Sequence, residues 1–379
     1  MAEYQFKSEI GSVEDPVAFQ EYFYNQGWTD GLPVVPPTPE RVSQFLDYVD
    51  LRPEEVITVI PTRNREINAE KLAINCVMAG CLPEYQPVVI AVLEAMSVPS
   101  YAFHASITST GGSAQFVVVN GPIRDQLGMN SDANVLGPGN RANSTIGRAL
   151  RLIMMNVAGA KPGVLDKSTH GHGGKYSFCI AEAEEISPWE PFHVEAGFSI
   201  DESTVTVFAA EAPHSIQNHL SGDPQELMIC IAKEMASMGA FSLGQSGLIL
   251  SPEHAGIIAK SGWSKKKIKE FIFENASLSL ADLKRYGKVG IKEIDISGDG
   301  RDKHRHKRPG DELAIKKMLM MEGPLTEGDE SIFIRRGISS DDILMVVAGG
   351  LAGGHSAFVP SWSRGRASLF QTKLIKASG

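Results

Sequence analysis

Short apolar runs that alternate with longer amphipathic segments constrain the fold of this chain more than any other feature. The runs are rich in Val and Ile and end at Gly, Pro, Asn or Ser, which is typical of buried strands. They are VITVI (56–60), QFVVVNG (115–121), KYSFCIA (175–181), STVTVFAA (203–210), SGLILS (246–251) and ILMVVAGG (343–350). This alternation predicts an α/β fold of layered mixed or parallel sheets with helices on their faces.

Proline and capping residues predict where several helices begin. Thr38 is a suitable N-cap for a helix that starts at Pro39, the second of two helical segments within residues 14–50. Further helices are predicted over 66–81, 82–96, 140–159, 224–239, 252–262 and 264–276. We expect a helical N-terminal segment over 1–50 and two similar-sized α/β lobes over 51–210 and 211–379.

Charge and composition narrow the possible partners. The 379 residues are 42% hydrophobic and carry a formal net charge of −9. Nucleic acids and anionic membranes attract a positive surface, so this charge disfavours both. The sequence shows neither a secretory signal nor an apolar run of membrane-spanning length, and its four cysteines lack the spacing of a disulfide framework. We predict a cytoplasmic protein that binds a small molecule and forms a homo-oligomer.

Cys81, in NCVMAGCLPEY, is the first candidate for chemistry. It follows one predicted helix and precedes Pro83, which opens the next, and unsatisfied N–H groups at such a position can favour a reactive thiolate. The alternative is a buried cysteine with a packing role. Cys76 lies five residues earlier, where helical spacing places it on a different face, so a thioredoxin-like pair is not predicted.

A run of hydroxyl and glycine residues in YAFHASITSTGGSAQFVVVNGP is the second candidate. His104 precedes Thr108, Gly111 and Gly112, and the strand that follows ends at Asn120. Hydroxyl and backbone donors in such a run can bind an anionic ligand or a developing oxyanion. The alternative is a Ser/Thr/Gly turn without a functional role.

LGPGNRANSTIGRALR (136–151) leads a glycine turn into the start of a long helix. Free N–H groups at a helix start attract anions, and an arginine can add a bidentate contact to a carboxylate. The glycine spacing matches neither a P-loop nor a dinucleotide-binding fingerprint. We predict a carboxylate-binding role, with a structural turn and cap as the alternative, for Asn140, Arg141, Asn143 and Ser144.

THGHGGKYSFC (169–179) allows three interpretations. If His170 and His172 lie in extended chain, their imidazoles face the same side and could share a divalent transition metal. The sequence offers as third ligands His104, His214, His219, Cys179, Glu182 and Glu211. The other interpretations are a catalytic or substrate-binding loop that carries Lys175, and a simple glycine-rich turn.

MVVAGGLAGGHSAFVPS (345–361) breaks a predicted strand with two pairs of glycines. Ligands of α/β proteins bind beyond the carboxyl ends of strands, where glycine lets the backbone approach them. Two interpretations stay open, a substrate-binding loop and a tight structural turn, for Gly353, Gly354, His355 and Ser356. The histidines of PHSIQNHL and SPEHAG, which include His219 and His254, are predicted to be caps or exposed residues.

The segment SGDGRDKHRHKRPGDE (297–312) concentrates basic residues at 301–308. A solvated surface loop and a patch that binds an anion or a partner are both consistent with this composition.

Several stretches together resemble an uncharacterised bacterial family whose members occur alone or joined to a UGSC-type domain, named for a selenocysteine or cysteine followed by Gly-Ser-Cys. The resemblance covers about residues 20–290 and 340–361. Its stretches are GWTDGLPVVPPTPERV, AINCVMAGCLPEYQPVV, VVVNGPI, LGPGNRANSTIGRALRL, THGHGGKYSFCIAEAEEISPWEPFHVE and SPEHAGIIAKSGWSKKKIKEFIFE.

The resemblance implies which residues of these stretches matter. The cysteine of the family pattern MAGCLPEY is Cys81 in this sequence, which makes Cys81 a stronger candidate for a functional cysteine than Cys76. The family's Gly-Pro-x-x-Arg-Ala-Asn stretch is matched by Gly137, Pro138, Arg141, Ala142 and Asn143. Its His-Gly-x-x-Gly-Lys-Tyr stretch is matched by His170, Gly171, Gly174, Lys175 and Tyr176. No stretch of the 379 residues resembles a UGSC-type thiol domain. We therefore expect a separate thiol or selenol protein to supply any activity that needs such a domain.

These features together predict an enzyme of lyase or hydrolase type that acts on a small polar or anionic organic molecule, with organosulfur compounds among the candidates. In this hypothesis Cys81 is a nucleophile or metal ligand, and His104 and Lys175 transfer protons. Two alternatives stay open. One is a metalloenzyme with a site at His170 and His172, and the other is a non-catalytic binding partner of a thiol or selenol enzyme.

Overall fold

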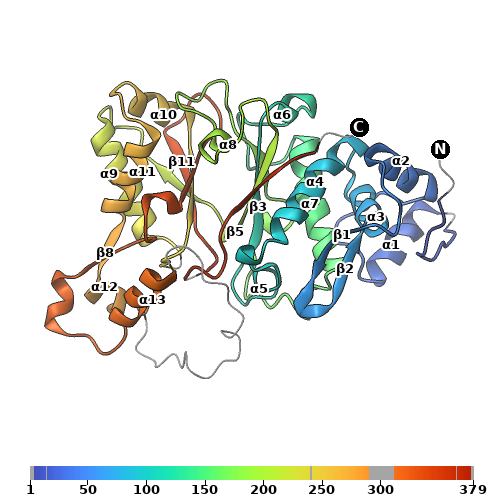
Figure 1. Ribbon diagram of the computed structural model, residues 1–379, viewed down its shortest axis with the longest axis horizontal. Helices are drawn as coiled ribbons and strands as arrows, with labels where there is room; N and C mark the ends of the chain where they lie inside the picture. The colour runs from blue at the N-terminus through green and yellow to red at the C-terminus, as the bar shows by residue number, and fades with distance from the viewer. Residues whose placement is uncertain (1–3, 14, 240, 290–310, 364, 377–379) are drawn as a thin grey trace. The chain divides into compact units, whose positions relative to one another are not determined.

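The computed structural model describes residues 4–13, 15–239, 241–289, 311–363 and 365–376. It is an α/β protein, which confirms the fold class that the alternating pattern predicts (Figure 1). The chain divides into two compact units. Unit 1 comprises Met1–Glu182, His193–Ala209 and Phe370–Gly379, and unit 2 comprises Ala183–Phe192 and Ala210–Leu369.

Unit 1 is built on a four-stranded sheet with the strand order β12-β5-β3-β4. Strand β3 runs parallel to β4, and β12 runs antiparallel to β5. Every residue of β5 is buried, including Thr204 and Thr206. The strands are β3 (Ala114–Asn120), β4 (Cys179–Ala181), β5 (Thr204–Ala210) and β12 (Gln371–Leu374), and a separate antiparallel pair is formed by β1 (Val56–Ile60) and β2 (Arg65–Asn68).

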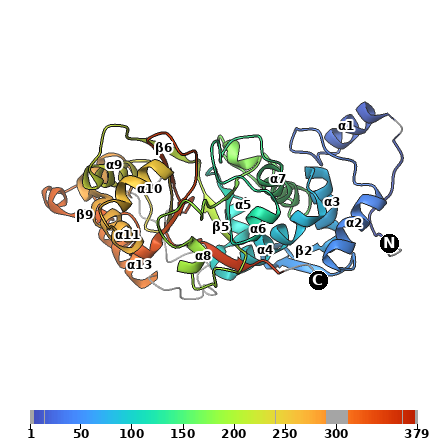
Figure 2. The same cartoon turned by 90° about the horizontal axis from the view of Figure 1, so that it is seen from above.

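The helices of unit 1 pack around this sheet. Helix α7 contacts β3 and β4, and α4 contacts β12 (Figure 1). Helix α1 lies apart from α3 in Figure 2, and none of its residues is buried. The helices are α1 (Pro16–Asn25), α2 (Pro39–Val49), α3 (Ala69–Ala79), α4 (Gln86–Met96), α5 (Phe103–Ile107), α6 (Ile123–Gln126) and α7 (Arg141–Asn156), with 3₁₀ turns η1 (Pro61–Arg63), η2 (Pro83–Tyr85), η3 (Pro99–Tyr101) and η4 (Gly173–Lys175), while α8 (Phe192–Glu195) begins at the last residue of a unit 2 segment.

Unit 2 has its own four-stranded sheet, in the order β10-β7-β11-β6. Strands β10 and β7 are parallel and wholly buried, whereas β11 is antiparallel to both β7 and β6. The strands are β6 (His214–Gln217), β7 (Ser246–Leu250), β10 (Ile343–Val347) and β11 (His355–Val359), with a second antiparallel pair β8 (Ser277–Ser279) and β9 (Phe333–Arg335).

Helices α9, α10 and α11 supply apolar side chains to the core around this sheet. The helices of unit 2 are α9 (Pro224–Ser237), α10 (Pro252–Ala259), α11 (Lys265–Asn275), α12 (Leu280–Arg285) and α13 (Asp311–Met320), with 3₁₀ turns η6 (Glu327–Ser331) and η7 (Ser340–Asp342). Among the residues that the structure describes, no single helix is long and apolar enough to cross a membrane. The predicted basic patch at 301–308 lies outside the described residues.

Helix starts follow the capping signals of the sequence. The hydroxyl of Thr38 accepts a hydrogen bond from the backbone N–H of Arg41, and Pro39 is the first residue of α2, which confirms the predicted cap. The same order of a capping side chain and a proline begins α9, at Asp223, and α10, at Ser251. Local sequence therefore determines where these helices begin.

Candidate functional site

A small pocket in unit 1 lies where β3, α7 and the glycine-rich loop of residues 166–175 meet. The pocket is shallow and partly open to solvent. Its lining combines apolar side chains with two cations, an amide and a hydroxyl. The lining residues are Ser113, Ala114, Gln115, Gly147, Leu150, Arg151, Gly174, Lys175 and Phe178.

Asp166 organises the charged side of this pocket. Its Oδ2 lies 2.9 Å from Nη2 of Arg151 and 2.8 Å from Nζ of Lys175. Its Oδ1 accepts a hydrogen bond of 2.6 Å from the hydroxyl of Ser168. Nζ of Lys175 also donates to Oγ of Ser168 over 2.7 Å. These four side chains form one connected network, in which a single carboxylate faces two cations.

The network shifts the pKa values of both its anion and its lysine. Burial alone would raise the pKa of Asp166, but hydrogen bonds from Lys175 and Ser168 and the charge of Lys175 lower it to about 2. Burial lowers the pKa of Lys175, although Asp166 opposes the shift. Asp166 is therefore ionised at neutral pH, and Lys175 releases a proton more readily than an exposed lysine does.

Two glycine-rich loops meet at this network. The backbone N–H of Thr169 donates to the carbonyl of Thr110 over 2.9 Å, and the hydroxyl of Ser168 lies 3.0 Å from the carbonyl of Gly111. A Cβ on Gly174 would lie 2.7 Å from the ring of His172, so only glycine fits there. The structure thus brings together the predicted residues Gly111, Gly112 and Lys175.

The metal interpretation of THGHGGK requires a third ligand beside His170 and His172. Gly171 has a φ of +67°, so His170 and His172 do not lie in a continuous extended chain. Nδ1 of His172 accepts the N–H of Gly174 over 3.1 Å. Within the described part of the chain, no group of three or more His, Cys, Asp or Glu residues is placed to hold a metal ion. The metal site at His170 and His172 stays a prediction.

Cys81 lies in a different environment. It is buried at the end of α3, and its Sγ–H donates to the backbone carbonyl of Thr145 over 3.3 Å. Half-buried His104 lies on α5, where burial and the charge of Arg63 lower its pKa. Among the described residues, no hydrogen bond or ion pair joins Cys81 to His104 or to Lys175. The catalytic roles of Cys81 and His104 stay predictions.

The polar residues at the start of α7 contact other parts of the chain. Asn140 accepts the N–H of Asn143 as the N-cap, and Nε of Arg141 donates to the carbonyl of Gly80 over 3.1 Å. The side-chain amide of Asn143 exchanges two hydrogen bonds with the backbone of Asn130. The N–H of Ser144 donates to the carbonyl of Asn140. These contacts fit the cap and turn alternative, and the predicted ligand-binding role is not tested.

Three other predicted residues of unit 1 lie in separate places. Asn120 is buried at the end of β3, where its side-chain amide donates to Glu182 over 2.6 Å. Thr108 donates its hydroxyl to the carbonyl of His104 over 2.9 Å. Tyr176 is exposed.

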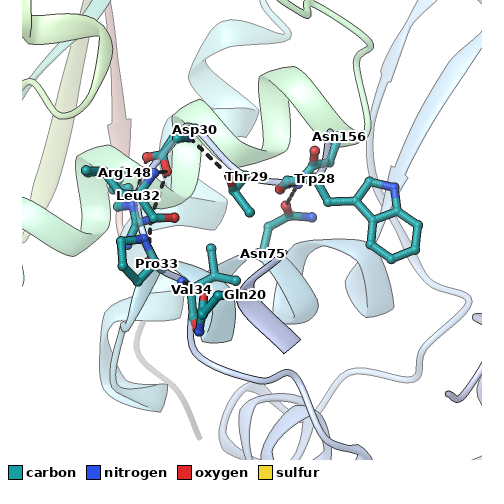
Figure 3. Close-up of polar contacts among 11 residues, drawn as sticks. Gln20, Trp28, Thr29, Asp30, Leu32, Pro33, Val34, Asn75, Arg148 and Asn156 are labelled. Atoms are coloured by element: carbon teal, nitrogen blue, oxygen red, sulfur yellow. Dashed lines mark hydrogen bonds and ion pairs between the residues drawn. The ribbon is translucent and has the colours of Figure 1, made fainter. Parts of the chain in front are cut away.

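The GWTDGLPVV stretch packs against α7 through polar contacts (Figure 3). Arg148 makes two 2.8 Å contacts with the carboxylate of Asp30 and donates to the carbonyl of Pro33 over 2.8 Å. The amide of Asn156 donates to the carbonyl of Trp28 and to the side chain of Asn75, each over 2.8 Å (Figure 3). These contacts give this distinctive stretch a structural role.

Unit 2 buries a second polar cluster, around His254. Nδ1 of His254 lies 2.7 Å from the hydroxyl of Ser356, and its Nε2 lies 2.9 Å from the carbonyl of Asn218. A carbonyl can only accept, so Nε2 carries the proton and Nδ1 accepts from Ser356. The N–H of Ser251 also donates to Ser356, over 3.2 Å. The prediction that His254 is a cap or an exposed residue is wrong, because the ring is fully buried.

The glycine turn at 353–354 packs beside this cluster. The N–H of Gly354 donates to Nδ1 of His219 over 3.3 Å, and a Cβ on Gly354 would lie 2.2 Å from the carbonyl of Asn218. The exposed rings of His219 and His355 are edge to face, with centroids 4.7 Å apart. The turn is therefore held tightly against its neighbours.

Three central residues of the unit 1 network are absent from the sequence-based candidates. Arg148 and Arg151 lie on the same helix, and the sequence does not distinguish their roles. In the structure Arg151 lines the pocket, whereas Arg148 binds Asp30. The Asp-Lys-Ser segment at 166–168 carries a weak signal, because aspartate and serine two residues apart often form a local turn. Comparison with known proteins finds no matching family model, no matching curated protein and no matching solved structure.

Proposed function

We propose that this chain is an enzyme of lyase or hydrolase type that acts on a small organic acid in the Arg151–Lys175 pocket. The observation that carries the proposal is the convergence of two cations and an unpartnered buried hydroxyl on one small cavity. Ser113 is 4% exposed, lines the pocket, and its Oγ has no hydrogen-bond partner among the described residues. A buried hydroxyl without a partner is costly, so a ligand that accepts its hydrogen bond would be stabilised.

The charge of the site favours an anionic ligand. Arg151 and Lys175 carry two positive charges, and Asp166 balances one of them. A guanidinium has five N–H donors on three nitrogens. Nη2 of Arg151 donates to Asp166, so the donors on its other nitrogens remain to bind a carboxylate. The apolar walls at Leu150 and Phe178 suit a short carbon chain. A small organic acid satisfies both features.

Lys175 is the residue we assign to proton transfer. Its Nζ lines the pocket, and burial makes it a stronger acid than an ordinary lysine. In an elimination or a hydrolysis it would donate a proton to the leaving group, with Ser168 and Asp166 holding the ammonium in position. Asp166 itself is a poor base, because its pKa is about 2.

Turnover assays with a lysine variant test this proposal. The purified chain is incubated with a set of small hydroxy, mercapto and dicarboxylic acids, and products are followed by proton NMR. We expect Lys175→Met to lower turnover by two to four powers of ten, the usual range for removing a general acid. Lys167→Met is the matched control, because Lys167 is an exposed neighbour that binds only the carbonyl of Gly163, and it should keep full activity.

Two outcomes favour the alternatives. Binding of an acid without any turnover would favour a non-catalytic binding partner of a thiol or selenol enzyme. Turnover that requires an added divalent metal and is lost in His170→Ala would favour the metalloenzyme. Full activity of Lys175→Met would contradict the role of the lysine, and full activity of Cys81→Ser would remove the thiol from the reaction.

We further propose that the enzyme is a cytoplasmic homodimer. Its separate partner would be a UGSC-type thiol or selenol protein. Light scattering after gel filtration tests the dimer, and co-purification with a tagged UGSC-type protein tests the partner.

A further inference from the structure

The end of helix α3 brings two cysteines together. The N–H of Gly80 donates to the carbonyl of Val77 over 2.9 Å, and the N–H of Cys81 donates to the carbonyl of Cys76 over 3.0 Å. Gly80 has a φ of +88°, in the left-handed region. These two bonds and the left-handed glycine define a Schellman motif, in which the chain folds back over the last turn of the helix.

The motif places the side chains of Cys76 and Cys81 against each other. In a Schellman motif the residue after the glycine contacts the residue that accepts its N–H, five positions earlier. The two thiols also share a side-chain hydrogen bond, and a disulfide requires two cysteines that lie this close together. The prediction that Cys76 faces away from Cys81 is wrong, because Cys81 lies beyond the end of the helix and no longer follows helical spacing.

The two thiols interact with each other and differ in access to solvent. Burial, together with the neighbouring Cys81 thiol, raises the pKa of Cys76. Cys76 is fully buried, whereas Cys81 is 6% exposed. A third buried cysteine, Cys179, also lies within electrostatic range of Cys81. Cys81 is therefore the thiol that a small oxidant meets first, and Cys76 is the thiol held against it by the backbone.

We propose that Cys76 and Cys81 are a peroxide-sensitive pair that closes to an intramolecular disulfide. The inference does not depend on the proposed function, because it rests only on the end of α3.

The chemistry takes two steps and consumes one molecule of hydrogen peroxide. The Cys81 sulfur attacks one peroxide oxygen, the O–O bond breaks, and the departing hydroxide takes the thiol proton to form water, leaving a sulfenic acid. The Cys76 sulfur then attacks the Cys81 sulfur, the S–O bond breaks, and the hydroxide leaves as water with the proton of Cys76. Two thiols are oxidised to one disulfide, and the peroxide is reduced to two waters.

Closure would alter the contact between α3 and α7. In the thiol form the Sγ–H of Cys81 donates to the carbonyl of Thr145 on α7. A disulfide sulfur has no proton to donate, so that hydrogen bond is lost. Oxidation would thereby act on the helix that also carries Arg151.

Peptide mapping tests the pair directly. The full chain is treated with hydrogen peroxide under native conditions, its free thiols are alkylated after denaturation, and it is digested with trypsin. Cys76 and Cys81 share the single tryptic peptide 72–124, whereas Cys179 and Cys230 lie in others. We expect this peptide to lose two hydrogen atoms and to resist alkylation at both cysteines until a reductant is added.

Three results would overturn the inference: both thiols stay open to alkylation after peroxide, Cys81 becomes cross-linked to the Cys179 peptide, or Cys81 proceeds only to sulfinic acid. Cys179→Ser should leave the disulfide unchanged, and Cys230→Ser is the control for general oxidation. In Cys76→Ser, a sulfenic acid at Cys81 should be trapped by dimedone. The mapping of the unaltered chain decides the question even if that variant fails to fold.

Discussion

Unit 1 and unit 2 each bury a serine hydroxyl, and the two hydroxyls differ in their hydrogen bonds. Ser356 in unit 2 bonds to His254 and to the N–H of Ser251. Ser113 in unit 1 is equally buried, at 4% against 3% exposure, yet its hydroxyl has no partner among the described residues. The comparison teaches that burial and polarity do not by themselves mark a functional site. We propose that donors that line a cavity and lack acceptors do.

The largest effect is expected at the centre of the unit 1 network. Asp166→Ala leaves Arg151 and Lys175 buried beside each other without a counter-charge. Removing one partner of a buried ion pair costs about 3–5 kcal/mol of unfolding free energy. Chemical denaturation measures the loss. Glu330→Ala is the matched control, because its pair with Arg285 is exposed and should contribute less than about 1 kcal/mol. Equal losses of unfolding free energy in both variants would show that Asp166 does not stabilise the two buried cations.

In unit 2, truncation of the buried imidazole should cost somewhat less. His254→Ala removes a ring that packs without exposure and leaves the carbonyl of Asn218 and the hydroxyl of Ser356 without this partner. We expect a loss of about 2–4 kcal/mol, from the cavity and the unpaired groups together. His219→Ala, on an exposed ring, should cost less than about 1 kcal/mol. Weakened binding of organic acids in His254→Ala would contradict the assignment of acid binding to the unit 1 pocket.

Acid should weaken the His254 cluster at a higher pH than the Asp166 network. The pKa of His254 lies below its usual value of 6.5, mainly because of burial, with Asn218 and Glu253 opposing the shift and His355 and His219 adding to it. The unfolded chain therefore binds a proton first, and stability falls as the pH drops below about 6.5. Half-buried His104 acts in the same direction in unit 1.

The Asp166 network loses its contribution only at lower pH. The pKa of Asp166 is lowered from 3.8 to about 2, so its stabilisation is complete above 3.8 and is lost as the pH falls towards 2. A shift of this size corresponds to roughly 2 kcal/mol. Hydrogen exchange read by mass spectrometry separates the two clusters: peptides from α10 should lose protection first, and His254→Gln should remove that early loss. Simultaneous loss of protection in α10 and in the loop that carries Asp166 would contradict the comparison.

The two serines give the most direct contrast. Ser356→Ala leaves Nδ1 of His254 without a donor and the N–H of Ser251 without an acceptor. We therefore expect the unfolding free energy to fall by about 1–3 kcal/mol. Thermal and chemical denaturation measure the change.

The smallest loss of stability is expected for Ser113→Ala. Because this hydroxyl is buried and has no hydrogen-bond partner among the described residues, its removal breaks no bond and relieves an unpaired polar group, so the unfolding free energy should stay the same or rise. A loss as large as that of Ser356→Ala would show that Ser113 is bonded in the folded chain, and the argument for a ligand would fail.

The sequence predicts the regular elements well and the site only in part. Runs dominated by apolar and β-branched residues are sufficient to predict β3, β5, β7 and β10, because such side chains pack well on the faces of a buried strand. The strands β6 and β12, with the sequences HSIQ and QTKL, lack that pattern and exist because neighbouring strands pair with them. Their formation depends on tertiary contacts that a local pattern does not contain.

The same limit applies to the site. Lys175 and the glycines at 111 and 112 are predicted, because glycine-rich loops have a local signature. Arg151, Asp166 and Ser113 are not, since each belongs to a different element and they meet only in the folded chain. The contact of Cys76 with Cys81 is also missed, because helical spacing does not extend past the Schellman turn.

Calorimetric titration of acetate into the chain, two matched serine variants and Arg151→Met tests the central claim most directly, with neutral acetamide as the control ligand. The account predicts that acetate binds once per chain, that acetamide binds at least tenfold more weakly, and that Ser113→Ala and Arg151→Met weaken acetate binding while Ser356→Ala, if folded, does not. Equal binding of acetate and acetamide, or unchanged acetate binding in Ser113→Ala and Arg151→Met, would contradict an anion site in this pocket.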